Sequence, residues 1–289
     1  MDLPHPFIVV DQNQLRDAEA IGQALDRCCR ERLQVLLPDG AGSEMSKGSK
    51  PFDTWRRSLS HISPYSEYVS LARKMTEMMH EEDRTGRPVE TLVDDRAVDR
   101  FRSMLNNQAK GDLSQLQEMI NGPVQEEVPA SLAVWGDHAR NKRRIQHMCE
   151  VLRDQVSREL LDRLRRSPME ALTSWVTSDD GTRFVFQGMK HRGSSDEDAI
   201  CLSRGASVAA HFYLALAALA AWWLAHGGLD DAAPEKITND ISDVEYAVLG
   251  ALSVDLLSRD KRLNDIYGVV RAAARSRHQW FDLHVPLES

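Results

Sequence analysis

The sequence has few cysteines and no excess of positive charge. Four cysteines occur in 289 residues, and no two of them form a C-x-x-C pair. The sequence therefore indicates neither a zinc knuckle nor a disulfide framework. The formal net charge of −8 argues against a protein that coats nucleic acid through bulk charge, but it is compatible with a metal-filled acidic pocket. No basic segment followed by an apolar one opens the chain, so we expect no secretory signal and a cytoplasmic location.

Signature motifs of several enzyme classes are also missing. The sequence has no Walker phosphate loop, no G-x-G-x-x-G, no H-E-x-x-H and no G-x-S-x-G. It shows no internal repeat and no low-complexity tract. With 42% hydrophobic residues it has enough apolar content for a sizeable core, and its length suits one large domain or two small ones.

One long stretch, residues 205–228, lacks Asp, Glu, Lys and Arg. It is long enough to span a membrane, which needs about 20 apolar residues. However, it is rich in alanine, it contains His211 and His226, and no basic cluster at one end would orient it. We therefore predict a buried core helix and no membrane partner.

Both ends of the chain have α/β character. Residues 7–10 and 34–37 are short apolar runs, as expected for strands buried on both faces. The segment 13–33 between them carries one apolar stripe of a helix. The C-terminal part predicts a helix at about residues 240–252, a strand at 254–258 and a final helix at about 261–275.

The middle of the chain is mainly helical in pattern, at residues 65–80, 94–105 and 140–164. Two apolar runs flank the turn sequence Ser178-Asp179-Asp180-Gly181, which predicts a β-hairpin near residues 174–187. We therefore predict an α/β domain built from residues 1–60 and 200–289. A mainly α-helical insertion, residues 61–199, would interrupt it.

Four acidic residues follow or flank the predicted strands. Asp11 ends the first strand, Glu44 follows the second, Asp243 lies in the helix before the last strand, and Asp260 lies just beyond that strand. Ligands of open α/β sheets gather beyond the carboxyl ends of the strands. Carboxylates that converge there would repel one another unless a hard cation lay between them, and Mg²⁺ or Mn²⁺ suits such a cluster. The constellation predicts hydrolysis of a phosphodiester by a metal-activated water.

The order and spacing of these acids resemble PIN-domain nucleases. The run IVVDQN at residues 8–13 resembles their hydrophobic-Asp-x-Asn opening, and residues 35–45 are similar to their second motif, a strand, a proline and a glutamate. Residues 243–260 are similar to the third and fourth motifs, an aspartate-led helix and a strand ending in Thr/Ser-x-Asp. The resemblance covers about residues 5–60 and 235–275, and the long helical middle departs from it.

The resemblance implies an α/β, PIN-like three-layer fold with a central, mostly parallel sheet. It implies an endonuclease that uses Mg²⁺ or Mn²⁺, with RNA as the favoured substrate and DNA left open. Asp11, Glu44, Asp243 and Asp260 would be catalytic and would bind the metal; Asp240 could support or replace Asp243, and Asn13 and Ser258 would steady the site. A homodimer and an inhibitor or regulatory protein are further partners that such a nuclease could have.

Other interpretations stay open. Asp11, Asp240 and Asp260 could be helix caps, and Glu44 a solvated helix residue. Arg140, Lys142, Arg143, Arg144 and Arg259 could bind a phosphate backbone or simply face solvent. A haloacid-dehalogenase-type phosphatase also has an Asp after its first strand, but it needs a second Asp where this chain has Asn13. A non-catalytic PIN-like scaffold is the remaining alternative.

Overall fold

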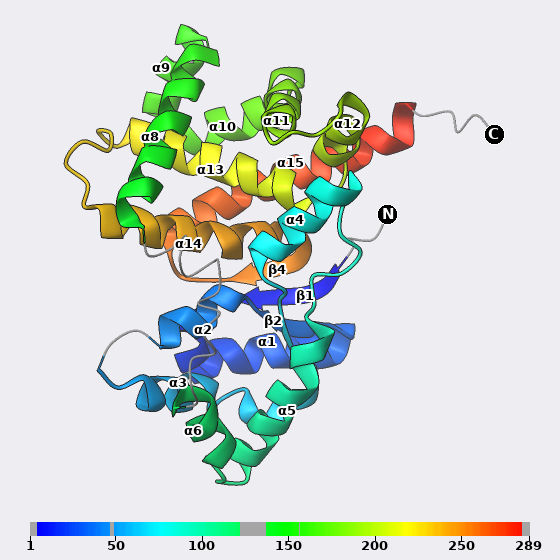
Figure 1. Cartoon of the computed structure of the whole chain (residues 1–289), viewed down its shortest axis with the longest axis vertical. Helices are drawn as coiled ribbons and strands as arrows, with labels where there is room; N and C mark the ends of the chain where they lie inside the picture. The colour runs from blue at the N-terminus through cyan, green and yellow to red at the C-terminus, as the bar shows by residue number, and fades with distance from the viewer. Residues whose placement is uncertain (1–4, 47–48, 122–136, 156, 285–289) are drawn as a thin grey trace.

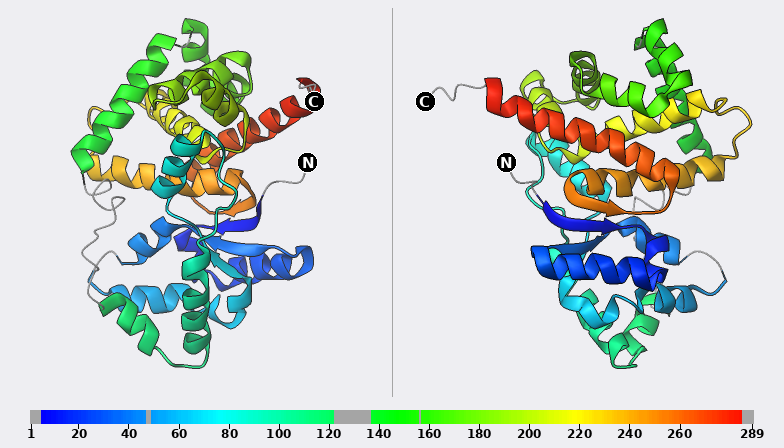
Figure 2. Two further views of the ribbon diagram at one scale, coloured as in Figure 1. Left: turned by 45° about the vertical axis from the view of Figure 1, so that its right-hand side comes forward. Right: turned by 180° about the vertical axis from the view of Figure 1, so that it is seen from behind.

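The protein is an α/β molecule, mostly helical, with one small parallel sheet. The structure is a computed structural model and describes residues 5–46, 49–121, 137–155 and 157–284. Figures 1 and 2 show the sheet between two groups of helices, so that both of its faces are covered. This agrees with the mixed α/β class that the apolar runs predict.

The sheet has four parallel strands in the order β3-β2-β1-β4. The strands are β1 (His5–Val10), β2 (Gln34–Leu37), β3 (Val69–Leu71) and β4 (Ser253–Leu257). In the register, Ile8 is opposite Val35 of β2 and Asp255 of β4. The predicted strands at residues 7–10, 34–37 and 254–258 are confirmed to within a residue at each end, except that β1 begins two residues earlier.

One group of helices covers one face and one end of the sheet. Helix α1 buries the predicted apolar stripe, including Ile21, Leu25 and Cys28. Asp17 breaks the predicted helix 13–33 into two, because its side chain accepts hydrogen bonds from Glu19 N and Ala20 N and caps α1. The elements of this part are η1 (Gln12–Arg16), α1 (Ala18–Glu31), α2 (Asp39–Met45), α3 (Pro51–Leu59), η2 (Ser63–Tyr68), α5 (Asp95–Ala109) and α6 (Ser114–Asn121).

The other face carries a larger helical layer, the upper half of Figure 1. Helix α14 packs on β1 and β4, and α15 packs on α14. The predicted helix 240–252 begins earlier, at Pro234, which suits a first helical turn because it needs no N–H donor there. The helices are α4 (Met75–Thr85), α8 (His138–Gln155), α9 (Arg158–Arg166), α10 (Pro168–Val176), α11 (Asp179–His191), α12 (Asp196–Arg204), α13 (Val208–Ala225), α14 (Pro234–Ala251) and α15 (Lys261–His284).

Helix α13 is the uncharged stretch of the sequence. Among the described residues it alone is long and apolar enough to cross a membrane by length and composition. The structure buries 67% of it among other helices, which is the packing that a core helix requires. Its buried residues include His211.

The predicted β-hairpin near residues 174–187 is wrong. Trp175 and Val176 end α10, and residues 183–186 lie within α11. Ser178 caps α11 by accepting a hydrogen bond from Gly181 N, at 3.4 Å. A side chain at Gly181 would lie 2.4 Å from the Trp175 carbonyl oxygen, so the turn sequence forms a tight corner between two helices.

Strand β3 lies inside the segment predicted as a helical insertion. Residues 65–80 were expected to be one helix, but they hold the end of η2, then β3, then the start of α4. Val69, Ser70 and Leu71 pair with Val35, Leu36 and Leu37 of β2. A strand of three residues is too short for a periodic signal, and its pairing with β2 depends on contacts distant in sequence.

Candidate functional site

The strand order places β1 and β4 at a change of direction in the sheet. The chain passes from β1 to β2 and β3 on one side, and β4 lies on the other side of β1. In open α/β sheets the crevice beyond the carboxyl ends at such a point is the usual ligand site. Asp11 follows β1 and Ser258 follows β4, so both residues lie at this point.

Asp11 is buried and held from two sides. Its Oδ2 accepts a hydrogen bond from Ser258 Oγ at 2.8 Å, and its Oδ1 accepts one from the backbone N of Asn13 at 3.2 Å. Burial raises the pKa of the Asp11 carboxyl; these two hydrogen bonds lower it, and the negative charge of Asp260 raises it. The structure therefore brings Asp11, Ser258 and Asp260 together, with Asn13 contributing its backbone and an exposed side chain.

Asp260 is exposed and begins helix α15. Its Oδ1 accepts a hydrogen bond from Leu263 N at 2.8 Å, and its own N donates to Ser258 Oγ at 3.0 Å. It thus caps α15, as the alternative interpretation predicts. Its charge nevertheless raises the pKa of Asp11, Asp240 and Asp243, which shows that it lies within electrostatic reach of each.

Asp240 and Asp243 project from one face of α14 and share a cation from α15. Arg262 Nη2 lies 2.7 Å from Asp240 Oδ1 and 3.1 Å from Asp243 Oδ2. Asp240 is buried, and its Oδ2 also accepts a hydrogen bond from Trp223 Nε1 at 3.0 Å. The interpretation of Asp240 as a helix cap is wrong, because α14 begins at Pro234 and Asp240 lies inside it.

Burial raises the pKa of Asp243 to about 7 despite the contact with Arg262. The negative charges of Glu44 and Asp260 contribute to this rise, and Arg262 opposes it. A carboxyl that titrates near neutral pH beside other acids is typical of functional sites, although structural ion pairs also shift pKa values. Burial, more than the neighbouring acids, therefore accounts for the raised pKa of Asp243.

Glu44 reaches the same edge of the sheet from α2. Its Oε2 accepts a hydrogen bond from the Tyr246 hydroxyl at 3.1 Å, and its charge acts on Asp243. The solvated-residue interpretation of Glu44 is wrong in this respect, since the side chain is only partly exposed and bonded to a buried tyrosine. Tyr246 also joins α2 to α14.

Sequence reasoning missed a further acid, Glu245, at the same edge. It is 4% exposed, and its carboxylate accepts backbone hydrogen bonds from Asp39 and Gly40 at the start of α2. Burial raises the pKa of Glu245 to about 8, and the charges of Asp39 and Glu44 raise it too. A side chain at residue 40 would lie 2.9 Å from Glu245 Oε2, so the glycine permits this close approach. Nothing in the helical pattern distinguished Glu245 from its neighbours.

The acids gather at one edge without forming a complete metal cage. No group of three or more His, Cys, Asp or Glu side chains within the described ranges is placed to hold a metal ion. The donor chemistry, carboxylates with a serine hydroxyl, fits a hard divalent cation. In this structure Arg262 is the counter-charge that touches Asp240 and Asp243.

The basic residues singled out from the sequence bond to other groups or are exposed. Lys142 Nζ donates to the carbonyl oxygens of Asp230 and Ala232, at 3.1 and 3.0 Å, and so ties α8 to the loop before α14. Arg259 pairs with Asp17. Arg140, Arg143 and Arg144 are exposed on α8.

Comparison with known proteins adds no relative. No family model, no curated protein and no solved structure matches the chain. The site itself has a distinct geometry. It offers a buried, serine-bonded carboxylate at the change of direction of the sheet and further acids within electrostatic reach.

Proposed function

We propose that the chain is a PIN-like, Mg²⁺- or Mn²⁺-dependent endonuclease that hydrolyses phosphodiester bonds, with RNA as the favoured substrate. The observation that carries this proposal is the placement of Asp11, Glu44, Asp243 and Asp260. Residues from four parts of the sequence come to the carboxyl edge of one parallel sheet, where their charges act on one another. The sheet, covered by helices on both faces, supports the PIN-like architecture.

The chain's own residues have distinct roles in this proposal. Asp11, Asp243 and Asp260 would hold the cation, with Glu44 completing the set or orienting a water. Ser258 fixes the orientation of Asp11, and Tyr246 fixes that of Glu44. Arg262 keeps Asp243 beside Asp240. When bound, the cation supplies an activated water and offsets charge on the phosphoryl group.

Cleavage of labelled RNA in Mn²⁺ or Mg²⁺ tests the proposal. The wild-type protein should cut the RNA, EDTA should stop the reaction, and Asp11→Asn should abolish it while the protein stays folded. Asp26→Asn is the matched control, because Asp26 is an exposed aspartate on α1. Full activity in Asp11→Asn would remove the basis of the assignment.

A non-catalytic PIN-like scaffold is the second candidate, and one observation favours it. Arg262 already bridges Asp240 and Asp243, which reduces their need for a metal. Calorimetric titration with Mn²⁺ separates the candidates. A nuclease should show a site that Asp11→Asn and Asp243→Asn weaken, whereas a scaffold should show no tight site that depends on these residues.

A further inference from the structure

A polar pocket of about 660 Å³ lies at the carboxyl end of β3, beyond the residues that resemble the nuclease motifs. Thr91, Val93 and Asp94 are among its lining residues, and their segment runs alongside the end of β3. Asp94 N donates to Leu71 O at 2.9 Å, and Arg73 N donates to Leu92 O at 2.8 Å. Helix α5 then begins at the pocket, capped by Asp94, whose Oδ1 accepts from Arg96 N and Ala97 N.

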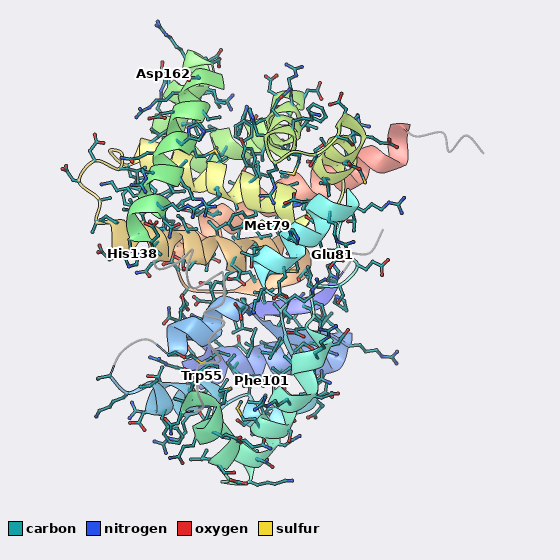
Figure 3. All side chains as sticks on the ribbon, in the orientation of Figure 1. Trp55, Met79, Glu81, Phe101, His138 and Asp162 are labelled. Atoms are coloured by element: carbon teal, nitrogen blue, oxygen red, sulfur yellow. The ribbon has the colours of Figure 1, made fainter. Side chains whose placement is uncertain are left out.

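Two arginines of this pocket lie on α5. Arg96 and Arg100 are four residues apart on α5, so they lie on one face of the helix. Both are exposed, and neither forms an ion pair with any residue that the structure describes. The third arginine, Arg73, is held by Glu81 of α4 at 2.5 Å. Figure 3 shows Glu81 on α4.

Acidic residues also line the pocket, but two of the three are engaged. Asp94 caps α5, and Glu77 pairs with Lys74 at 3.4 Å. Asp95 is exposed in the first turn of α5. The groups of the pocket with no cap or ion pair among the described residues are therefore Arg96 and Arg100, with two positive charges, and Asp95, with one negative charge.

A second, apolar pocket of about 230 Å³ adjoins the first. The two share Ala97 and Arg100, so Arg100 stands at their boundary. Phe101, Met104 and Met119 line the apolar pocket, and Met119 is 40% exposed, one of few large apolar side chains so open to solvent in the described part of the chain. Figure 3 shows Phe101 on α5, on the side of the sheet that carries α3 and α6.

We propose that these adjoining pockets bind one nucleotide of a single strand, with its phosphate on Arg96 and Arg100 and its base in the apolar pocket. Arginine suits phosphate because its planar fork donates several hydrogen bonds, and a base is a flat apolar group that packs on aromatic and methionine side chains. A paired cationic and apolar surface of this size matches a nucleotide better than a free anion, which would use the arginines alone.

The pocket lies close to the acidic edge of the sheet. We infer the role of the subsite from that position, and this role rests on the proposed function. Just beyond β3, Ala72 N donates a hydrogen bond to Leu37 O at the end of β2, at 2.9 Å, and α2 with Asp39 and Glu44 follows β2 directly. The pocket thus continues the same edge of the sheet that holds Glu44 and Asp243. A strand anchored at α5 would extend along this edge toward Asp11.

Binding in EDTA tests the subsite without cleavage. Fluorescence anisotropy of a short labelled single-stranded RNA should show binding that weakens about 10-fold for Arg96→Gln and again for Arg100→Gln, the loss expected for a charged hydrogen bond. Met119→Ser should weaken it by a smaller factor. Arg30→Gln is the matched control and should bind like wild type. Arg30 is an exposed arginine at the end of α1, just before β2 begins.

A competition arm distinguishes the source of the nucleotide. Uridine monophosphate that displaces the strand indicates a pocket for a free nucleotide, whereas displacement only by unlabelled strand indicates that neighbouring phosphates contribute; either result supports the subsite. Wild-type affinity in the Arg96→Gln, Arg100→Gln double variant, or no binding by the wild-type protein, overturns it. Cleavage by Asp11→Asn overturns the proposed function instead, because that change leaves the α5 pockets intact.

Discussion

At the residue scale, the same acids serve as caps and as candidate ligands. Asp11 uses one oxygen to cap η1 and the other to accept from Ser258, and Asp260 caps α15. The capping interpretation is therefore confirmed for both residues, and it does not compete with a role in the site. A cap fixes the rotamer of a carboxylate, which is what a binding site also requires.

A buried acid outside the site, Glu82, accepts four hydrogen bonds from described residues and yields a clear prediction. Glu82 is fully buried on α4 and accepts hydrogen bonds from Ser207 Oγ and the backbone N of Val208 and Ala209, at 2.7 to 2.8 Å, as well as from Val89 N at 3.2 Å. Glu82→Ala would leave these donors at the start of α13 unsatisfied. We expect a loss of about 3 kcal/mol or more in the free energy of unfolding, since each unsatisfied buried donor costs roughly 1–3 kcal/mol.

Urea unfolding measures this loss, and Glu90→Ala is the control. Glu90 is an exposed acid in the segment that follows α4. Its removal should change the free energy of unfolding by less than about 0.5 kcal/mol. Equal effects of the two changes would contradict the capping role of Glu82.

At the element scale, the close packing of α11 on α13 depends on Gly188 of α11. A side chain at Gly188 would lie 2.4 Å from the ring of Tyr213 on α13, while one at Gly22 of α1 would meet nothing within 4 Å. Gly188→Ala should destabilise the protein by about 1–3 kcal/mol through overpacking. Gly22→Ala should stabilise it by about 0.5–1 kcal/mol, because alanine favours a helix. Thermal unfolding of both variants checks the opposite signs.

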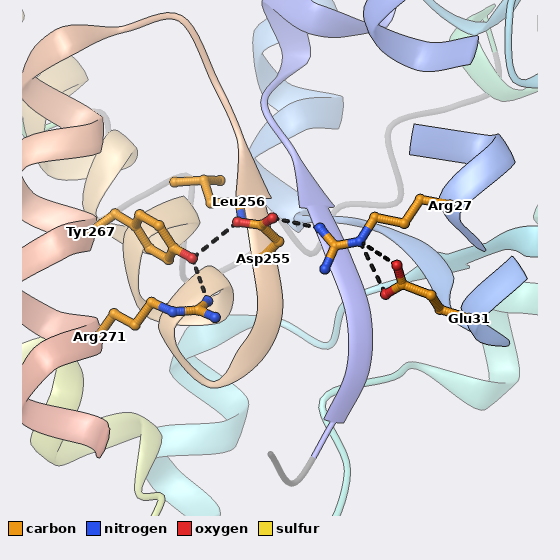
Figure 4. A network of polar contacts seen from close by, with 6 residues as sticks. All are labelled: Arg27, Glu31, Asp255, Leu256, Tyr267 and Arg271. Carbon is orange, nitrogen blue, oxygen red and sulfur yellow. Dashed lines mark hydrogen bonds and ion pairs between the residues drawn. The ribbon is translucent and has the colours of Figure 1, made fainter. Parts of the chain in front are cut away.

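The edge strand β4 is tied to helices on both sides of the sheet, as Figure 4 shows. Asp255 accepts from Arg27 Nη1 of α1 at 2.6 Å and from the Tyr267 hydroxyl of α15 at 3.2 Å, and Arg271 bonds the same hydroxyl. Because Asp255 is 41% exposed, the Arg27–Asp255 pair is partly screened by solvent. A double-mutant cycle of Arg27→Ala and Asp255→Ala should give a coupling of about 0.5–1 kcal/mol. Coupling near zero in low salt would show that the pair adds no stability.

The elements that the sequence predicts well are those with a local signal. Residues 7–10 and 34–37 are continuous apolar runs and form strands. The predicted hairpin failed because the turn sequence at Ser178 also suits a helix N-cap, and only packing of α11 on α13 decides between the two. The Asp11 position could be predicted from a strand end, whereas Glu245 and Arg262 are defined by contacts between distant segments.

At the scale of the whole molecule, the fold concentrates negative charge that the sequence spreads over its length. Acids from α2, α14 and the start of α15 converge with Asp11 because β4 returns to lie beside β1. The net charge of −8 is thus partly a property of one edge of the sheet. Such an edge should respond to pH and to cations as a unit.

The response to pH has a defined sign. The ordinary pKa values of Asp243 and Glu245 are 3.8 and 4.5, and burial raises them to about 7 and about 8. At a pH between the ordinary and the raised pKa of each group, the folded protein holds a proton that the unfolded chain has released. Raising the pH through this window therefore favours unfolding, by up to about 1.4 kcal/mol per pH unit for each group. In EDTA, the free energy of unfolding should fall as the pH rises from about 5 to about 8.

Metal should reverse this loss if the edge binds a cation. A bound Mn²⁺ favours the ionised carboxylates, so it should restore the free energy of unfolding at pH 8 and have little effect at pH 5, where Asp243 and Glu245 are protonated. Urea unfolding at both pH values, with EDTA or with Mn²⁺, measures the difference. Asp243→Asn should flatten the decline with pH and remove most of the effect of Mn²⁺, while Asp26→Asn should change neither. A decline with pH that Mn²⁺ does not reverse would leave an acidic edge balanced by Arg262 alone, the behaviour expected of a scaffold and not of a nuclease.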